Sequence, residues 1–242
     1  MVPIEGASLG AQRQNLRVPD DISPATARYD GLADWYERLA APSADFSREA
    51  LVDLLGRGDG LCLDLGCGTG LYAEILRSTG RQVIGVDISK DQLRHARVRE
   101  PVAAADATRL PIRTAALDDV TAIWVHGDLD DLPSVLAEVA RVLRPGGRLF
   151  LFGIHPCFNG PCVENLPDGS RIVHSNYRDS GWHRTAPWWG ASGIRHTVGV
   201  RHRPLAELIN DVLESGLQLL RVEEPRDEPV PAVLAMVATR SR

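Results

Sequence analysis

The residues from Leu61 to Leu71 read LCLDLGCGTGL and decide the fold of this chain. Apolar residues lead up to Asp64, glycines then occupy positions 66, 68 and 70, and an apolar-periodic run continues to Leu76. This order is typical of a buried strand that turns tightly into a helix. Because glycine has no side chain, backbone N–H groups at the start of that helix can approach an anionic group of a small molecule.

The spacing of these glycines excludes two common nucleotide-binding loops. A dinucleotide-binding loop has its third glycine where this chain has Leu71, and the Gly-Lys-Ser/Thr of a P-loop is absent. A nicotinamide-dependent oxidoreductase is therefore disfavoured. Asp64 ends the predicted strand, so its carboxylate is placed to hold a cationic ammonium group beside the loop.

Length and charge bound the class of protein. The sequence has 242 residues, 44% of them hydrophobic, which is enough for one large domain with a substantial core. Its net charge of −5 and its scattered arginines argue against nucleic acid as the main partner, since phosphate binding needs a clustered basic face. Without a long apolar run or a signal-peptide pattern, we expect no membrane association and a cytoplasmic location.

Strands and helices alternate along the chain. Four strands are predicted after the first, at Gln82–Val86, Pro101–Ala105, Asp118–Val125 and Arg148–Gly153. The alternation specifies right-handed crossovers and an open parallel sheet with helices on both faces. Two further strand-like runs, Leu217–Val222 and Ala232–Thr239, are joined by a segment too short for a crossover helix, so they must pair antiparallel or splay apart.

Acidic residues stand at the ends of three successive strands. Asp64, Asp87 and Asp106 occupy these positions, and Trp124 ends the next strand. Ligands of open α/β sheets bind beyond the carboxyl ends of the strands, so these side chains are expected to share one site. A carboxylate at Asp87 can accept both hydroxyl groups of a ribose and would repel a phosphate on that ribose.

The segment Asp64-Leu-Gly-Cys-Gly-Thr-Gly70 resembles the first motif of the class I S-adenosylmethionine-dependent methyltransferases. The passage Glu-Val-Ala-Arg-Val-Leu-Arg-Pro-Gly-Gly at 138–147 is similar to the segment that precedes the fifth strand in many small-molecule members. The resemblance extends over roughly residues 25–242. It implies a three-layer, Rossmann-like α/β sandwich whose seven-stranded sheet is mostly parallel with an antiparallel last strand, and S-adenosylmethionine as cofactor.

The resemblance also implies which residues bind that cofactor. Asp87 corresponds to the residue that holds the ribose, and Ile88 would lie against the adenine. Asp106 would accept from the adenine amino group, with the Ala107 N–H meeting a ring nitrogen. The expected cofactor-binding residues are Tyr29, Tyr36, Asp64, Gly66, Cys67, Gly68, Gly70, Asp87, Ile88, Asp106, Ala107 and Trp124.

The region before the glycine loop is expected to be a flexible segment at 1–24 followed by two helices. The first, Ala25–Leu39, is amphipathic, with Tyr29 and Tyr36 on one face. These tyrosines either pack on the sheet or, as in similar segments of the family, lie over cofactor and substrate as lid residues. The second helix, Ser47–Leu55, is expected to end at a left-handed cap on Gly56.

About fifty residues, 155–203, separate the fifth strand from the next predicted helix and lack clear periodicity. Long irregular segments in compact domains are usually functional. We therefore interpret 25–242 as one methyltransferase domain in which 155–203 is an inserted cap over the acceptor substrate; the alternative is a small satellite core under a structural loop. The expected substrate-binding residues are Phe158, Tyr177, Trp182, His183, Trp188 and Trp189.

Two histidines are candidate bases for a hydroxyl acceptor. His155 follows the fifth strand directly and is the first candidate, and His126 at the end of the fourth strand is the second. His155, Cys157 and Cys162 do not have a standard zinc spacing, and the reducing cytosol disfavours a disulfide, so no metal is expected.

The sequence thus predicts methyl transfer from S-adenosylmethionine to a small-molecule acceptor, preferentially a hydroxyl of a secondary metabolite in natural product biosynthesis. Two alternatives share the same cofactor half: a cyclase or pericyclase-like enzyme that keeps the cofactor as a structural or electrostatic element, and a non-catalytic cofactor-binding protein. The oligomeric state stays open, with a homodimer as one option.

Overall fold

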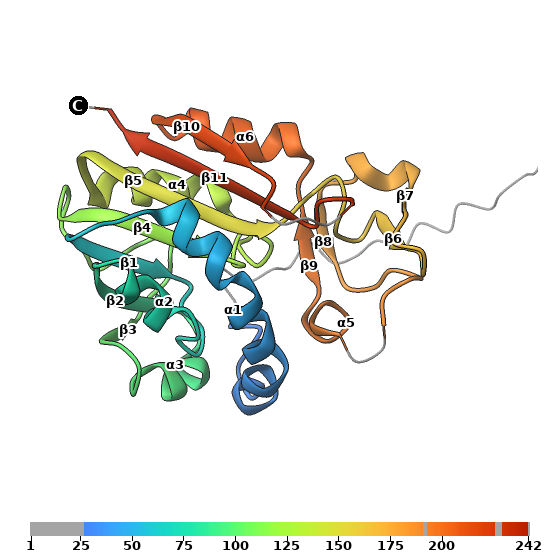
Figure 1. Ribbon diagram of the computed structural model, residues 1–242, viewed down its shortest axis with the longest axis horizontal. Helices are drawn as coiled ribbons and strands as arrows, with labels where there is room; N and C mark the ends of the chain where they lie inside the picture. Colours follow the sequence, from blue (N-terminus) through green and yellow to red (C-terminus); the bar gives the residue numbers. More distant parts are fainter. Residues whose placement is uncertain (1–26, 191–192, 226–228, 242) are drawn as a thin grey trace, which may run out of the picture.

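The core of the protein is a seven-stranded sheet in the order β10-β11-β5-β4-β1-β2-β3 (Figure 1). The computed structural model describes residues 27–190, 193–225 and 229–241, so the segment expected to be flexible, 1–24, lies outside the described residues. Neighbouring strands are parallel except at β11, which is antiparallel to both β5 and β10. The expected mostly parallel sheet with one reversed strand is confirmed. The strands are β1 (Leu61–Leu65), β2 (Gln82–Asp87), β3 (Val102–Ala104), β4 (Leu117–Ile123), β5 (Leu143–Ile154), β10 (Leu217–Glu223) and β11 (Val233–Arg240).

Helices cover both faces of the sheet, which confirms the three-layer arrangement. Alternating residues of β5 face opposite layers, as the two-residue period of a strand requires. Leu149 and Leu151 pack with α4 (Leu132–Val142) and α6 (Leu205–Glu214), whereas Phe150 and Phe152 pack on the side of α1 (Ala33–Leu55) and α2 (Ala73–Ser78). The shorter α3 (Lys90–Ala96) lies beside β2 and β3, and the Ser89 hydroxyl caps it by accepting from the Gln92 N–H.

The N-terminal helices differ from the prediction. The expected helices at 25–39 and 47–55 are one helix, α1, with Pro42 inside it. Proline removes one helical hydrogen bond, but Leu51, Leu54 and Leu55 bury the C-terminal half against the sheet and sustain the helix. The helix begins only at Ala33, because Asp91 Oδ2 accepts the N–H groups of Gly31 and Ala33 at 2.9 and 3.0 Å. Gly56 follows it with a φ of 57° and donates its N–H to the Val52 carbonyl, but its ψ of −171° lies outside the left-handed helical region that was expected.

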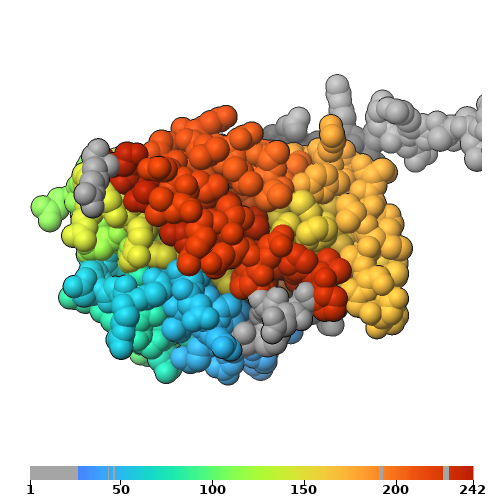
Figure 2. Space-filling view, turned by 45° about the horizontal axis from the view of Figure 1, so that its top comes forward, coloured from blue at the N-terminus to red at the C-terminus, as the bar shows by residue number. Residues whose placement is uncertain are grey.

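The segment 155–203 contains short elements that the sequence did not indicate. Antiparallel pairing joins β6 (Val163–Asn165) to β7 (Arg171–Val173), and β8 (Gly181–His183) to β9 (Val200–His202). A short 3-10 helix, η1 (Ser175–Arg178), and the single-turn α5 (Ile194–Val198) complete it. The segment gathers at one end of the molecule, beyond the carboxyl end of β5 (Figures 1 and 2). Within the described ranges, no helix combines the length and the apolar character that a membrane span requires.

Candidate functional site

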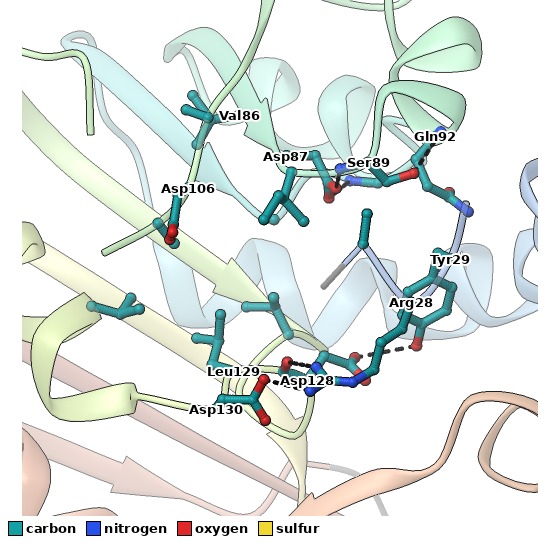
Figure 3. A pocket seen from close by; sticks show the side chains of 18 of the residues that line it. Arg28, Tyr29, Val86, Asp87, Ser89, Gln92, Asp106, Asp128, Leu129 and Asp130 are labelled. Atoms are coloured by element: carbon teal, nitrogen blue, oxygen red, sulfur yellow. Dashed lines mark hydrogen bonds and ion pairs between the residues drawn. The ribbon is translucent and has the colours of Figure 1, made fainter. Parts of the chain in front are cut away.

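A cavity of about 470 Å³ opens at the carboxyl ends of β1, β2 and β4. It is called the donor cavity below. Figure 3 shows its wall, with Asp87 and Asp106 across the opening from Asp128 and Asp130, and with Arg28 and Tyr29 at the side. The position is the one that parallel α/β sheets use for ligands, because strand tips and helix starts meet there.

The glycine loop forms the floor of the donor cavity. Gly66 and Gly68 line it, with φ angles of 69° and 54°. A Cβ atom on Gly66 would lie 2.4 Å from Cγ2 of Val125, so this position requires glycine for both backbone and space. Cys67 and Gly70 do not line the cavity. Cys67 is buried against Leu93 and Ala96.

Asp87 and Asp106 are the carboxylates that the strand ends bring to the donor cavity. The Asp87 oxygens accept the N–H groups of Ser89 and Gly68 at 2.8 and 2.9 Å. In Asp106, Oδ1 accepts the N–H and the hydroxyl of Thr108, both at 2.8 Å. A carboxylate oxygen can accept about two hydrogen bonds, so both side chains keep capacity for hydroxyl or amino groups of a ligand. Ile88 and Ala107 line the same wall.

Burial affects the Asp87 carboxyl group directly. Loss of solvent raises its pKa, and the two backbone N–H groups oppose that shift. A ligand hydroxyl that donates to this oxygen would replace part of the missing solvation.

Aromatic side chains form the other wall of the donor cavity. Tyr29 lies in the turn before α1 and packs edge to face on Tyr36, with ring centroids 5.3 Å apart. Trp124 follows β4 directly and has a φ of 59°, which is unusual for a bulky residue. Its backbone N–H donates to the Phe152 carbonyl at 2.6 Å, which holds the residue at the strand tip. Both tyrosines and Trp124 line the cavity as expected from the sequence.

Several lining residues were missed by the sequence reasoning. Asp128 and Asp130 stand in the loop after β4, where a run of glycine and aspartates was noticed but given no role. Arg28 bonds to the Asp128 carbonyl at 3.0 Å and pairs with Asp130, and its guanidinium lies 3.8 Å from the ring centre of Trp182. These contacts tie the turn before α1 to the loop after β4 and to β8. Only the fold could reveal them, because the residues lie about one hundred positions apart.

A second cavity of about 470 Å³ adjoins the first and is called the acceptor cavity below. Tyr29, Tyr36 and Trp124 line both cavities. Trp188 and Trp189 of the segment 155–203 also line the acceptor cavity, together with Tyr72, Arg195 and His196. The ring of Trp188 stacks on His174 at 4.0 Å with 7° between the planes, which fixes its orientation.

The other four aromatic residues expected to bind substrate lie elsewhere. The Tyr177 hydroxyl accepts the Leu205 N–H at 2.8 Å, and Trp182 lies under Arg28. His183 contacts the Asp179 carbonyl at 2.9 Å, and Phe158 packs on His155. None of these four lines either cavity. They connect parts of the segment 155–203 with each other and with the rest of the domain, so the structure does not bring them to the acceptor cavity.

Neither candidate base reaches a cavity. His155 is 1% exposed, with Nε2 at 2.9 Å from Glu224 and Nδ1 accepting the Cys157 N–H at 3.1 Å. Burial lowers the pKa of His155 and, to about 3, that of His126. Neither residue lines the donor or the acceptor cavity. The histidine that does line the acceptor cavity is His196 of α5.

Asp64 lies behind the glycine loop instead of in the donor cavity. It is 2% exposed, and its Oδ1 accepts the Thr121 hydroxyl at 3.2 Å. Its Oδ2 and both oxygens of Glu100, which is 4% exposed, have no hydrogen-bond partner within the described part of the chain. Burial raises the pKa of both groups, that of Glu100 to about 7, and the charge of Glu100 raises that of Asp64 further.

The raised pKa of Glu100 predicts a pH-dependent stability. Between pH 4.5 and about 7 the folded protein binds this proton more tightly than the unfolded chain, so stability falls as the pH rises through this window. We expect a loss of about 3 kcal/mol in the wild type, from about 1.4 kcal/mol per pKa unit. In Glu100→Gln this contribution is absent, and the pH dependence from buried Asp64 remains. Urea denaturation at pH 4.5 and 8 measures it; a stability difference between the two proteins that does not change with pH would contradict the prediction.

The donor cavity fits the cofactor that the sequence implies. Its volume lies in the ordinary range for small-molecule sites, about 300–1,000 Å³. The glycine loop suits an anionic group, because its backbone N–H groups are accessible. The carboxylates have free acceptor capacity for ribose hydroxyls, and the aromatic faces suit a cationic sulfonium. These features define a small-molecule-binding α/β protein with its ligand at the carboxyl ends of a mostly parallel sheet.

Comparison with known proteins gives the family. A family model described as "Methyltransferase domain" matches residues 63–151. Malonyl-[acyl-carrier protein] O-methyltransferase from Hahella chejuensis is 31% identical over 241 residues, covering 93% of this chain and 81% of that protein. Demethylmenaquinone methyltransferase from Mycolicibacterium paratuberculosis is 34% identical over 137 residues, 54% of this chain and 58% of that protein. The chain belongs to the class I S-adenosylmethionine-dependent methyltransferases.

Solved structures agree in fold. An S-adenosylmethionine-dependent methyltransferase from Mesorhizobium loti superposes with a TM-score of 0.66 at 24% identity, over 81% of this chain and all of that one. The [4+2]-cyclase SpnF superposes with a TM-score of 0.56 at 19% identity, over 88% of this chain and 85% of that one. Three of the curated relatives are matched over only 28%, 58% and 52% of their own length. These likenesses establish the fold and the family, and leave the acceptor to be argued from the site.

Proposed function

We propose that this protein transfers a methyl group from S-adenosylmethionine to a hydroxyl group of a small-molecule acceptor, in the biosynthesis of a natural product. The observation that carries this proposal is the pair of adjoining cavities that share Tyr29, Tyr36 and Trp124. A transferase needs two ligands side by side, with their reacting atoms in line and in near contact. A protein that only binds the cofactor has no need of the second cavity.

The donor cavity supplies residues for each part of the cofactor. Asp87 would accept the ribose hydroxyls, and Asp106 and the Ala107 N–H would hold the adenine edge. Gly66 and Gly68 would let the backbone approach the amino-acid end. When bound, S-adenosylmethionine supplies an electrophilic methyl group on a positively charged sulfur. Tyr29, Tyr36 and Trp124 would orient the reacting ends and exclude water between the two cavities.

The base for a hydroxyl acceptor is proposed to be His196, because it is the histidine among the residues that line the acceptor cavity. Imidazole is the commonest general base in enzymes, and such proton transfer typically contributes 10²- to 10⁴-fold to a rate. His196→Ala is therefore expected to lower kcat about 100-fold or more while S-adenosylhomocysteine still binds.

The comparison variant is His155→Ala, which removes the candidate that the sequence favoured. Because both His155 ring nitrogens already have partners, we expect this variant to lose stability and to keep its turnover number at temperatures where it is folded. Steady-state kinetics with both variants decides between the two histidines. Loss of turnover in folded His155→Ala with full turnover in His196→Ala would reverse the assignment.

The reaction class is tested by its product. Incubation with S-adenosylmethionine and a library of hydroxylated metabolites is expected to release S-adenosylhomocysteine in amounts equal to the methylated acceptor. Consumption of an acceptor without S-adenosylhomocysteine would indicate a cyclase, the reaction for which the SpnF neighbour is named. Tight cofactor binding without turnover of any acceptor would indicate a binding protein.

We also propose that the protein acts in the cytoplasm and on metabolites instead of nucleic acid. The net charge of −5 and the acidic lining of the donor cavity support the second part of this proposal, because both are unfavourable to a polyanion. A gel-shift assay at low salt with RNA and DNA fragments is expected to show no complex.

A further inference from the structure

The two cavities differ in the charge of their walls. The donor cavity is acidic: its lining includes the aspartates 87, 106, 128, 130 and 131, against the two arginines Arg28 and Arg201. The lining of the acceptor cavity, among the residues that the structure describes, contains no aspartate or glutamate. Its basic side chains are Arg195 and His196, both from α5. The second ligand therefore meets the guanidinium of Arg195 among aromatic and apolar walls.

Arg195 is held in place at the junction of the two cavities. Its Nη1 donates to Asp128 Oδ1 at 3.1 Å and to the Gly199 carbonyl at 3.4 Å. Tyr29 donates to the other oxygen of Asp128 at 3.2 Å, which fixes that carboxylate. The side chain of Arg195 is 23% exposed, so it is partly desolvated and still reachable from the acceptor cavity.

The contacts of Arg195 leave one edge of the guanidinium free. Both of its hydrogen bonds use Nη1, and within the described part of the chain Nε and Nη2 have no hydrogen-bond partner. These two nitrogens form the edge with which arginine binds a carboxylate through two parallel hydrogen bonds. Burial lowers the pKa of Arg195, but Asp128 and the neighbouring Tyr29 and Tyr36 together raise it by more, so the guanidinium stays cationic.

The other walls of the acceptor cavity fit a flat ring. Trp188 is locked by stacking on His174, and Trp189, Tyr72 and Trp124 add aromatic surface. A rigid aromatic wall binds a planar molecule at little cost in side-chain entropy. Arg195 and this wall line the same cavity, so one small ligand can reach both.

We propose that the acceptor is a small aromatic carboxylic acid whose carboxylate pairs with Nε and Nη2 of Arg195 while its ring lies against the tryptophan wall. This inference rests on the proposed function, since it assigns the second cavity to the methyl acceptor. Arg195 is then a specificity-determining residue. A neutral analogue leaves Nε and Nη2 of Arg195 without a carboxylate partner in a partly desolvated site, so the analogue binds less tightly.

The test uses 4-hydroxybenzoate and 4-hydroxybenzamide as matched probes, which share ring and hydroxyl and differ in charge. Binding to the protein saturated with S-adenosylhomocysteine is measured by ligand-observed NMR titration. The wild type is expected to bind the acid at least about 10-fold more tightly than the amide, the ratio that one charge-assisted contact of about 1.4 kcal/mol provides. Equal binding of the two probes, or binding of neither, would overturn the proposal.

Variants assign the preference to Arg195. Arg195→Gln is expected to bind the two probes equally, Arg195→Lys to keep part of the preference, and Arg184→Gln to behave as the wild type. Arg184 is the matched control because it is an exposed arginine of the same segment and lines neither cavity. A preference that survives in Arg195→Gln would refute the role of this residue. Affinity for S-adenosylhomocysteine, measured on each variant, reports folding.

These titrations, together with the turnover assay of the proposed function, separate this inference from the proposed function. If S-adenosylhomocysteine binds and neutral acceptors are methylated without any preference for acids, only the acceptor class is wrong. If S-adenosylhomocysteine does not bind to the folded wild type, the proposed function itself fails.

Discussion

Asp87→Ala is expected to weaken the binding of S-adenosylhomocysteine about 100-fold. The carboxylate stands at the tip of β2 in the wall of the donor cavity, where it would accept the ribose hydroxyls. Hydrogen bonds to a charged group contribute about 1.5–3 kcal/mol each, so the loss of two corresponds to at least about 3 kcal/mol. The substitution also leaves the N–H groups of Gly68 and Ser89 without their acceptor, which loosens the glycine loop.

Isothermal titration calorimetry measures this effect, with Asp59→Ala as a matched control on an exposed aspartate away from both cavities. Burial raises the pKa of Asp87, so its carboxylate is protonated at a higher pH than an ordinary aspartate. Wild-type affinity should therefore fall as the pH is lowered towards that pKa, and the fall should be absent in Asp87→Ala. An affinity loss of less than about 3-fold in Asp87→Ala would show that Asp87 does not hold the ligand.

Asp119→Ala is expected to lower the free energy of unfolding by about 3–5 kcal/mol, the usual cost of removing one partner of a buried ion pair. Asp119 is 3% exposed and lies near the start of β4. Its Oδ2 accepts from Arg81 Nε at 2.7 Å, and its Oδ1 from Arg148 Nε at 3.0 Å. The side chain of Arg81 is fully buried, so the substitution would leave its charge without a counter-ion.

Chemical denaturation tests this prediction, and Asp34→Ala is the control. Asp34 pairs with Arg94 on the surface, where such pairs contribute about 0–1 kcal/mol. Because Asp119 lies at the opposite end of the strands from the donor cavity, S-adenosylhomocysteine should bind the folded variant with wild-type affinity. A change in unfolding free energy as small as that of Asp34→Ala would mean that the buried charges find other partners.

The sequence predicted the sheet because its signals are local. The strands β1 and β2 are short apolar runs that end at Gly66 and Asp87, and the short charged link before Val233 excluded a parallel crossover. Residues that line the donor cavity were predictable for the same reason, since Asp87, Ile88, Asp106, Ala107 and Trp124 lie at or just beyond the ends of their strands. The sequence did not predict where α1 begins, because this start depends on hydrogen bonds to Asp91, which is distant in sequence.

The acceptor side of the site was the less predictable part. Aromatic residues are dense throughout 155–203, and the sequence does not distinguish Trp188, which lines a cavity, from Trp182, which lies under Arg28. His155 looked catalytic from its place after β5, but Glu224 and the Cys157 N–H occupy its ring nitrogens. The Tyr29–Asp128–Arg195 contacts join three separate segments, and only the folded chain brings them together.

A crystal structure of the protein with bound S-adenosylhomocysteine tests the central claim most directly. We expect the ribose at Asp87, the adenine beside Asp106 and Ala107, and the sulfur facing the acceptor cavity between Tyr29 and Trp124. Density for the ligand anywhere else, or a sulfur directed away from the acceptor cavity, would contradict the account of two adjoining cavities that together carry out methyl transfer.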